Sequence, residues 1–328
     1  MVKIGVIGVG HLGHHHVRIF KEISGCELIG IHDQNEERAA EISRKYKVRS
    51  YSDFERLLDD IDAIDIAVTT IHHYRLARIA LQKGKHLFIE KPITTTMAEA
   101  EELITLAREK NLKIQVGHIE RFNPIVLKIA DEINNPMFIE SHRLAPFSPR
   151  GSDVSVVLDL MIHDIDLICS FINSDIRDIR ASGVRILTPN IDIANARLEF
   201  DNGAIANVTA SRVSLKRERK IRFFQKDAYI SLDFQNKKVT VLKKSEDLNK
   251  VLPEVLLGKK NFNTDDIVDL KEIEATDITK DALTLELEAF VEAMNEDKRP
   301  CVDGEAGMKA LSVALSIMDK IKIREIKE

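Results

Sequence analysis

Several features that mark other classes of protein are missing from this sequence. Its 328 residues contain only three cysteines, Cys26, Cys169 and Cys301, which lie far apart and form no CxxC pair. Neither a disulfide framework nor a zinc site is predicted, so we expect no bound metal and a reducing compartment. The 48 basic and 53 acidic residues leave a net charge of −5 without a long block of one sign. This balance favours neither nucleic acid nor a membrane surface as a partner.

Long apolar segments are missing as well. No apolar run approaches the roughly 18 residues of a membrane span, and the first residues enter an expected strand rather than a signal peptide with a basic segment and an apolar region. We therefore expect a soluble protein of the cytoplasm. With 328 residues, 44% of them hydrophobic, the chain is long enough for two domains that each have a core.

A glycine-rich turn near the amino terminus is the most informative motif. Residues 3–7 form an apolar run rich in β-branched side chains, and the G-x-G-x-x-G sequence Gly8-Val9-Gly10-His11-Leu12-Gly13 follows it directly. In such a strand–turn–helix, the glycines permit a tight turn, close approach of a pyrophosphate and close packing of the helix, whose N-terminus attracts phosphate. The pattern predicts a dinucleotide site that includes Gly8, Gly10, His11, Leu12 and Gly13, rather than a plain structural turn.

An acidic residue indicates which dinucleotide is bound. Asp33 ends a second apolar run, twenty positions after Gly13, where a carboxylate accepts hydrogen bonds from the adenosine ribose. It would repel the 2′-phosphate of NADP, and Gln34 offers no charge to bind one, so NAD is the expected cofactor. Arg38 lies one helical turn further on and leaves NADP open as the alternative.

Polar residues follow two further apolar runs, at residues 63–68 and 86–89. Thr69, His72 and His73 follow the first run, and Glu90 and Lys91 follow the second, before Pro92. Ligands of parallel sheets bind at the carboxyl ends of the strands, so Thr69, His73, Glu90 and Lys91 are predicted to line the cofactor pocket. The ammonium of Lys91 would also stabilise a developing alkoxide or bind a substrate hydroxyl. The alternatives are an exposed histidine turn and a surface lysine.

The order of the expected elements divides the chain into domains. From residue 13 to about 120, helix-like and strand-like segments alternate, which predicts a doubly wound parallel sheet. A glycine, a proline and several polar residues at 117–124 suggest the crossing into a second domain. We therefore expect a dinucleotide-binding domain at 1–120, a second domain at 121–300, and a final helical segment at 301–328.

The second domain is expected to be α+β with an antiparallel sheet, because strand patterns and tight turns such as Asp201-Asn202-Gly203 follow one another directly. The interval 253–279 is polar and weakly patterned and is expected to be a loop region. The predicted strands cover residues 138–143, 179–187, 194–200, 204–211, 221–225, 229–234 and 239–243.

One segment of the second domain has the pattern of a helix that carries catalytic groups. Residues 156–171 are apolar except for Asp159, His163, Asp164 and Asp166. Asp159 and His163 are four residues apart and share one face of a helix, where a carboxylate can orient an imidazole that acts as a general base. A buried histidine with a structural carboxylate partner would show the same spacing.

Four motifs taken together resemble the Gfo/Idh/MocA family, which is named after glucose–fructose oxidoreductase and inositol dehydrogenase. They are the glycine turn, EKP at 90–92, GHxxRFNP at 117–124 and D-x-x-x-H-x-x-D at 159–166, and the match covers nearly the whole chain. The resemblance implies a Rossmann domain and a second domain with an open, mostly antiparallel sheet, which is the substrate and oligomerisation domain. It also implies that the last helix packs back on the first domain and that sheets pair between subunits of a homodimer or homotetramer.

The resemblance further implies an NAD-dependent dehydrogenase that oxidises a secondary hydroxyl of a sugar or cyclitol, with Lys91, Asp159 and His163 as its catalytic set. A non-catalytic NAD-binding sensor is the alternative, although a sensor has no need of these three residues. One departure concerns the approach to the catalytic helix, which is rich in glycine in many members but reads DVSVV at residues 153–157 here. The shape of the loop over the substrate is therefore not predicted.

Residues before and within the catalytic helix, at 143–147, 150, 153 and 159–166, are similar to the branch that oxidises the 3-hydroxyl of UDP-N-acetylglucosamine. This similarity implies a nucleotide-sugar substrate. Guanidinium groups suit a diphosphate, so Arg121, Arg143 and Arg150 are the candidate substrate contacts. The alternatives are surface or interdomain pairs for these arginines, and an inositol or free sugar as the substrate.

Overall fold

The computed structural model describes residues 1–149, 151, 153–245, 253, 255–257, 259, 268–275 and 278–321. The chain forms two compact units. Unit 1 comprises Met1–Phe122 and Lys280–Ser312, and unit 2 comprises Asn123–Thr279 and Val313–Glu328. Among the residues just named, no helix is long and apolar enough to cross a membrane.

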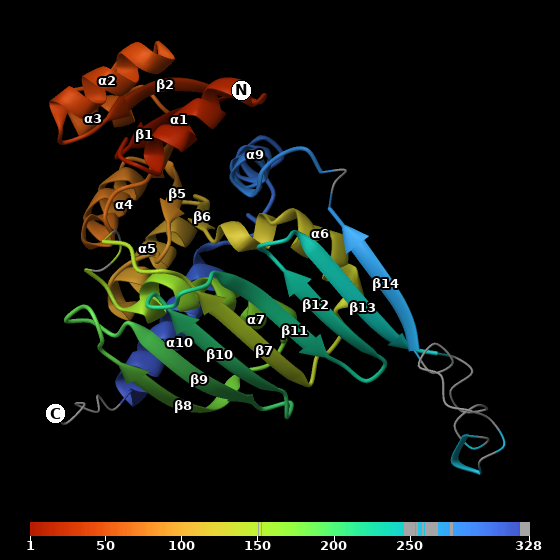
Figure 1. Ribbon diagram of the computed structural model, residues 1–328. Helices are drawn as coiled ribbons and strands as arrows, with labels where there is room; N and C mark the ends of the chain where they lie inside the picture. The colour runs from red at the N-terminus through yellow and green to blue at the C-terminus, as the bar shows by residue number, and fades with distance from the viewer. Residues whose placement is uncertain are drawn as a thin grey trace. The chain divides into compact units, whose positions relative to one another are not determined.

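Unit 1 is built on a six-stranded, wholly parallel sheet in the order β3-β2-β1-β4-β5-β6. Strands β1, β2, β5 and β6 of this sheet are labelled in Figure 1. Consecutive strands β3 and β4 lie on opposite sides of β1, so the winding direction reverses beside β1, where doubly wound folds bind ligands. The predicted Rossmann sheet is confirmed. Its elements are β1 (Val2–Ile7), α1 (Gly13–Glu22), β2 (Cys26–His32), α2 (Glu36–Tyr46), β3 (Arg49–Ser50), α3 (Phe54–Asp59), β4 (Ala63–Ile66), η1 (Thr70–His72), α4 (His73–Gln82), β5 (His86–Glu90), α5 (Met97–Glu109), β6 (Ile114–Gly117), η2 (Ile119–Phe122) and α9 (Ala282–Asn295).

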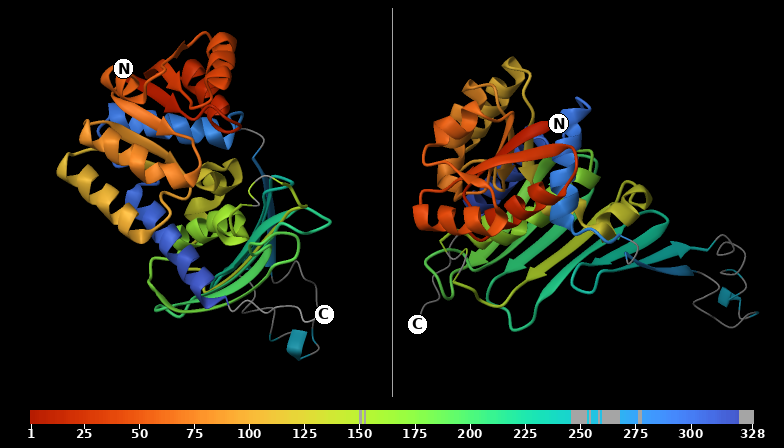
Figure 2. Two further views of the ribbon diagram at one scale, coloured as in Figure 1. Left: turned by 90° about the vertical axis from the view of Figure 1, so that its left-hand side faces the viewer. Right: turned by 90° about the horizontal axis from the view of Figure 1, so that it is seen from above.

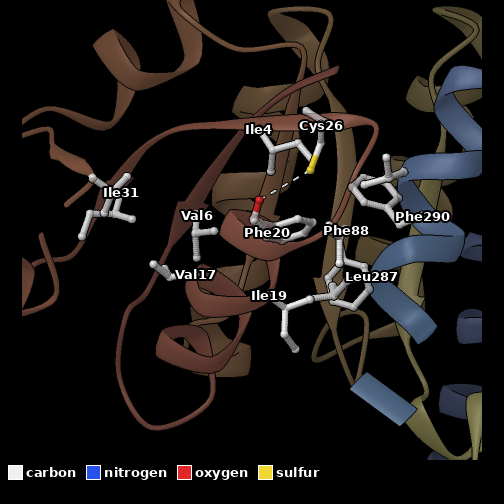
Figure 3. Close-up of a cluster of buried hydrophobic side chains, with 14 of the residues drawn as sticks. Ile4, Val6, Val17, Ile19, Phe20, Cys26, Ile31, Phe88, Leu287 and Phe290 are labelled. Carbon is white, nitrogen blue, oxygen red and sulfur yellow. Dashed lines mark hydrogen bonds between the residues drawn. The ribbon is translucent and has the colours of Figure 1, made fainter. Parts of the chain in front are cut away.

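A helix from late in the sequence completes the core of unit 1. Leu287 and Phe290 of α9 are fully buried with Phe20 of α1 and Phe88 of β5 in one apolar cluster (Figure 3). The rings of Phe88 and Phe290 meet edge to face, with centroids 5.7 Å apart. The sequence pattern extends the second domain to residue 300, but this packing assigns α9 to unit 1.

Unit 2 is built on an eight-stranded sheet in the order β14-β13-β12-β11-β7-β10-β9-β8. β7 and β10 are parallel and every other neighbouring pair is antiparallel, which confirms the mostly antiparallel sheet. Helices α6 and α7 lie against one face of it (Figure 2). The elements are α6 (Pro124–Ile129), η3 (Ala130–Glu132), β7 (Phe138–Leu144), the π-helical turn η4 (Val157–Met161), α7 (Ile162–Phe171), β8 (Ile176–Val184), β9 (Ile193–Phe200), β10 (Ile205–Ser211), β11 (Glu218–Phe224), β12 (Ala228–Asp233), β13 (Lys238–Lys244) and β14 (Val268–Glu274).

The strand β14 lies in the interval 253–279, which the sequence pattern predicts to be a loop region. That prediction is wrong for residues 268–274, because β14 is an edge strand with mostly exposed side chains and lacks the alternation of a half-buried strand. Opposite charges support its pairing with β13: Lys238 Nζ lies 2.7 Å from Glu272 Oε1. The last helix, α10 (Gly304–Lys320), belongs to unit 1 through Ser312 and to unit 2 beyond it.

The packing of α9 predicts how strongly unit 1 depends on it. Phe290→Ala should lower the free energy of unfolding by about 3–5 kcal/mol, because it empties a fully buried site. Urea denaturation followed by circular dichroism measures this change. Phe147, which is 43% exposed, is the matched control, and Phe147→Ala should have little effect. Equal losses in the two variants would contradict the role assigned to α9.

Candidate active site

The glycine turn has the geometry of a phosphate-binding loop. Gly8 has φ +85°, and a Cβ on Gly13 would lie 1.7 Å from the carbonyl oxygen of Gly8, so a side chain at Gly13 would prevent α1 from starting against the turn. Gly10 differs, because nothing among the described residues lies within 4 Å of the position of its Cβ. The open face of Gly10 at the N-terminus of α1 fits a diphosphate, and the neighbouring His11 and Leu12 are exposed.

Asp33 links the glycine turn to the next helix. Its Oδ2 accepts from the N–H of Val9 at 2.7 Å, and its Oδ1 accepts from the N–H of Asn35 at 2.9 Å. Each carboxylate oxygen has a second lone pair, so both bonds leave capacity for ribose hydroxyls. The carboxylate therefore lies beside the turn, where the sequence motif places the ribose.

Arg38 is the cation that could bind the 2′-phosphate of NADP, and its side chain is held at the same turn. Its Nε donates to the carbonyl of Val9 at 2.9 Å, and its Nη1 donates to Glu41 Oε2 at 2.7 Å. The guanidinium therefore already has acceptors beside Asp33. A 2′-phosphate would have to compete with both of them.

His73 does not line a pocket as predicted. Its ring is fully buried, with Nδ1 3.0 Å from the carbonyl of Pro92 and Nε2 3.0 Å from the carbonyl of Val68. A neutral imidazole has one N–H and donates to one of these carbonyls at a time, and burial lowers the pKa of His73 and favours that neutral form. His73 joins the segments after β4 and β5, whereas Thr69 at the end of β4 is exposed.

A buried ion cluster that the sequence analysis missed lies behind the end of β5. The fully buried His16 of α1 has Nδ1 2.7 Å from Asp65 Oδ2 and Nε2 3.3 Å from Glu90 Oε1. Burial alone would lower the pKa of His16, but the charges and hydrogen bonds of Asp65 and Glu90 raise it to about 10. Asp65 is the one polar residue of an apolar strand, which was the available signal; His16 was hidden among three consecutive histidines.

The same cluster fixes the carboxylate next to Lys91. Burial opposes ionisation of Glu90, but His16 and Lys91 outweigh it and hold the pKa of that carboxyl below its usual range. Glu90 Oε2 accepts from the backbone N–H of Lys91 at 3.2 Å, and a Cβ on Gly117 would lie within 3.0–3.2 Å of the Glu90 carboxylate. The Lys91–Pro92 peptide bond is cis. The Glu90 carboxylate therefore has one fixed position at the start of the Lys91 turn.

In unit 2, Asp159 and His163 lie on one continuous helical segment, as predicted. Asp159 is in the π-helical turn η4 and His163 is in the first turn of α7. π-Helical turns interrupt α-helices at functional sites more often than elsewhere. Gly151, with φ +75°, lies against this turn, and a Cβ there would be 2.8 Å from Asp159 Oδ2. Asp159 thus faces the backbone that leads into the helix.

The buried Arg212, also missed from the sequence, holds this approach segment. Its guanidinium donates to the carbonyls of Gly151 and Val154, and Nε lies 3.6 Å from Asp192 Oδ1. Asp192 in turn accepts backbone N–H bonds from residues 186–188, which outweigh its burial and lower its pKa. In place of glycines alone, the chain uses a buried arginine to shape the segment before the helix that carries Asp159 and His163.

The three candidate substrate arginines differ in their surroundings. Arg143 is 3% exposed, and its Nε and Nη2 both donate to Asp164 Oδ1, at 3.0 and 2.6 Å. This pairing favours a structural role for Arg143 over a substrate contact. Arg121 is half-buried in η2 of unit 1, and Arg150 lies outside the described residues.

Comparison with known proteins adds independent information. Residues 2–118 match the oxidoreductase family with an NAD-binding Rossmann fold, and residues 135–231 match the GFO/IDH/MocA C-terminal domain. The chain is 37% identical over 317 residues to UDP-N-acetylglucosamine 3-dehydrogenase of Acidithiobacillus ferrooxidans, which covers 96% of each protein. A solved structure of that enzyme superimposes with a TM-score of 0.87 at 34% identity and covers 98% of this chain and 97% of the other. Identity to scyllo-inositol 2-dehydrogenase (NAD(+)) of Bacillus subtilis is 28%, over 65% of this chain and 68% of the relative.

The surroundings of Asp33 predict a cofactor preference. Asp33→Ala should lower the ratio of NADPH to NADH dissociation constants by about tenfold or more, because it removes a charged hydrogen-bonding group and its repulsion of the 2′-phosphate. Titration of cofactor fluorescence measures both constants. Asp53→Ala, which removes the N-cap of α3 in the same unit, is the control and should leave the ratio unchanged. Tighter binding of NADPH than NADH by the unaltered protein would contradict the assignment.

The buried ion cluster predicts a stability that depends on pH. His16→Gln should cost about 3–5 kcal/mol near pH 6.5, because it leaves the fully buried Asp65 carboxylate without its cation and removes one of the two cations beside Glu90. The folded pKa of His16, about 10, exceeds the ordinary value of 6.5, so its contribution is complete below pH 6.5 and is lost as pH rises toward 10. Thermal midpoints at pH 6.5, 8 and 9.5 should therefore converge for the two proteins. His72→Gln is the control. A difference in thermal midpoint between the unaltered protein and His16→Gln that stays constant across this pH range would refute a protonated, charged His16.

Proposed function

This chain belongs to the Gfo/Idh/MocA family of NAD-binding oxidoreductases, and we propose that it oxidises the 3-hydroxyl of UDP-N-acetylglucosamine to a 3-keto nucleotide sugar. The observation that carries the proposal is the 37% identity to a UDP-N-acetylglucosamine 3-dehydrogenase across 96% of both chains. The inositol dehydrogenase relative is less similar and matches about two thirds of the chain. Membership of an oxidoreductase family argues against a non-catalytic sensor.

The proposed chemistry assigns one role to each catalytic residue. NAD held by the glycine turn at Gly8–Gly13 and by Asp33 would supply the acceptor for the hydride that leaves C3 of the sugar. His163 takes the proton of the 3-hydroxyl as general base, and Asp159 orients the imidazole and stabilises its cation. The Lys91 ammonium hydrogen-bonds the reacting oxygen and stabilises negative charge that develops on it. The hydroxyl thus loses one hydride and one proton and becomes a ketone.

The diphosphate of the substrate needs cationic partners. Arg121 and Arg150 remain the proposed contacts, because guanidinium groups bind phosphate oxygens in pairs. Arg143 is the weaker candidate, since Asp164 already takes two of its N–H donors. We also propose a cytoplasmic homodimer or homotetramer, supported by the family resemblance and the low cysteine content. Light scattering would measure its size.

A substrate panel tests the proposal directly. The protein with NAD is incubated separately with UDP-N-acetylglucosamine, free N-acetylglucosamine, myo-inositol and glucose. The formation of NADH is measured by its absorbance. A carbonyl trap is included to draw the reaction forward if ketone formation is uphill. We expect turnover with the nucleotide sugar only. Turnover of inositol or glucose without turnover of UDP-N-acetylglucosamine would contradict the proposed substrate. The protein would then be an inositol or free-sugar dehydrogenase of the same family.

Substitution of the general base should slow the chemical step. His163→Ala should lower kcat by about a hundredfold or more, the usual size for loss of a positioned base, and Asp159→Asn should be milder if Asp159 only orients it. Lys91→Met should remove most turnover while NADH still binds. His142→Ala, a half-exposed histidine of β7, is the control. Near wild-type rates for His163→Ala or Lys91→Met would remove that residue from the mechanism.

A further inference from the structure

Three histidines gather around the glycine turn. His11 lies within the turn, and His14 and His15 form the first turn of α1. The ring of His11 is 6.1 Å, centroid to centroid, from the rings of both His14 and His15, which are 3.9 Å from each other. Among the described residues, no three His, Cys, Asp or Glu side chains are placed to hold a metal ion.

The three histidines lie beside the surface that a diphosphate approaches. His14 Nδ1 is 3.0 Å from the carbonyl oxygen of Gly10. Gly10 is the residue of the turn whose Cβ position is open, and in this motif the pyrophosphate comes closest to that glycine. His11 is exposed, and His14 and His15 are half-buried. Protonated rings at these positions would add positive charge to that of the helix N-terminus.

The charged groups facing the cluster are mostly basic. The pKa of His15 is lowered, chiefly by burial and then by the positive charges of its neighbours His14, Arg18, His11 and His16. Arg38 of α2 approaches the turn from the other side, with Nη2 3.4 Å from the Gly10 carbonyl. Protonation of His15 is therefore costly until an anion binds.

The acidic groups nearby already have partners. Glu22 pairs with Arg18, and Glu41 pairs with Arg38. Asp33 accepts from two backbone N–H groups, and Asp65 and Glu90 lie against His16. The positive charge that the cluster gains on protonation is thus left for a ligand to balance.

We propose that His11, His14 and His15 form a protonation-dependent part of the diphosphate site, so that the binding of NAD(H) takes up protons and tightens as pH falls. The reason is linkage: an anion that binds the protonated rings more tightly raises their pKa, and the protein gains protons on binding. A rise of one pKa unit in one ring corresponds to about tenfold in affinity. The proposal rests on cofactor binding alone and does not depend on the substrate.

Calorimetric titration of the full-length protein with NADH tests the proposal. At pH 6.5, the binding enthalpy measured in buffers of different ionisation enthalpy should show net proton uptake. The dissociation constant should rise by about tenfold between pH 6 and 8.5. ADP-ribose, which keeps the diphosphate, should behave alike, whereas adenosine should bind without proton uptake. Absence of uptake with NADH, or equal uptake with adenosine, would overturn the proposal.

Variants separate the cluster from other titrating groups. The triple variant His11→Asn, His14→Gln, His15→Gln should lose the proton uptake, and its NADH affinity should change by no more than about twofold over the same pH range. His72→Gln, on the same unit but outside the cluster, should keep both properties of the unaltered protein. Unchanged uptake in the triple variant would refute the assignment. If the triple variant does not fold, His15→Gln alone should reduce the uptake, and an unchanged value would count equally against it.

Discussion

The buried contact of His16 with Asp65 and Glu90 is the interaction on which the first unit depends. It joins the helix that follows the glycine turn to two strands, β4 and β5, whose carboxyl ends carry Thr69 and Lys91. A buried charge that loses its partner is far more costly than an exposed one, so the three side chains hold these elements in one arrangement. The protonated His16 thereby helps to position both the glycine turn and Lys91, the proposed catalytic lysine.

In the second unit, buried guanidinium groups hold the secondary-structure elements together, as the buried ion cluster does in the first. Arg143 ties β7 to α7 through Asp164, and Arg212 ties the segment before the catalytic helix to the 186–192 loop through Asp192. Arg143 directs two of its donors to one carboxylate oxygen of Asp164, whereas Arg212 satisfies the backbone carbonyls of Gly151 and Val154 at once, which suits the fixing of irregular backbone. The π-helical turn that carries Asp159 follows the segment that Arg212 holds. The helix with the proposed general base is thus anchored at its beginning.

Local patterns were sufficient to predict most of the architecture. Most of the parallel strands are buried apolar runs and most of the antiparallel strands alternate. The glycine turn has sharp steric requirements at Gly8 and Gly13, so these elements were recognisable by themselves. The edge strand β14 was missed because solvent covers most of its side chains. The helix α9 was recognised but assigned to the wrong domain, because periodicity shows that a helix buries one face and does not show which partner covers it.

The site was less predictable than the fold for a related reason. Residue type and position along the chain brought His73 and Arg143 into consideration, but both side chains are turned inward to partners that are distant in sequence or on another element. His16 and Arg212 were missed because their partners lie 49 and 20 or more residues away. A sequence motif identifies a binding site reliably where the backbone itself forms the site, as at the glycine turn. It does not show whether a given side chain faces a ligand or a buried partner.

The position of α9 also has a consequence for biosynthesis. The core of the first unit is closed by Leu287 and Phe290, which a ribosome adds more than 150 residues after Phe122, the end of the unit's first segment. Domains generally fold as units while the chain is being made, from the amino terminus onward. Here the amino-terminal sheet must wait, with the apolar surface of Phe20 and Phe88 uncovered, until α9 has been synthesised. The core of the first unit is therefore completed only after residues 123–279 of the second unit have been made.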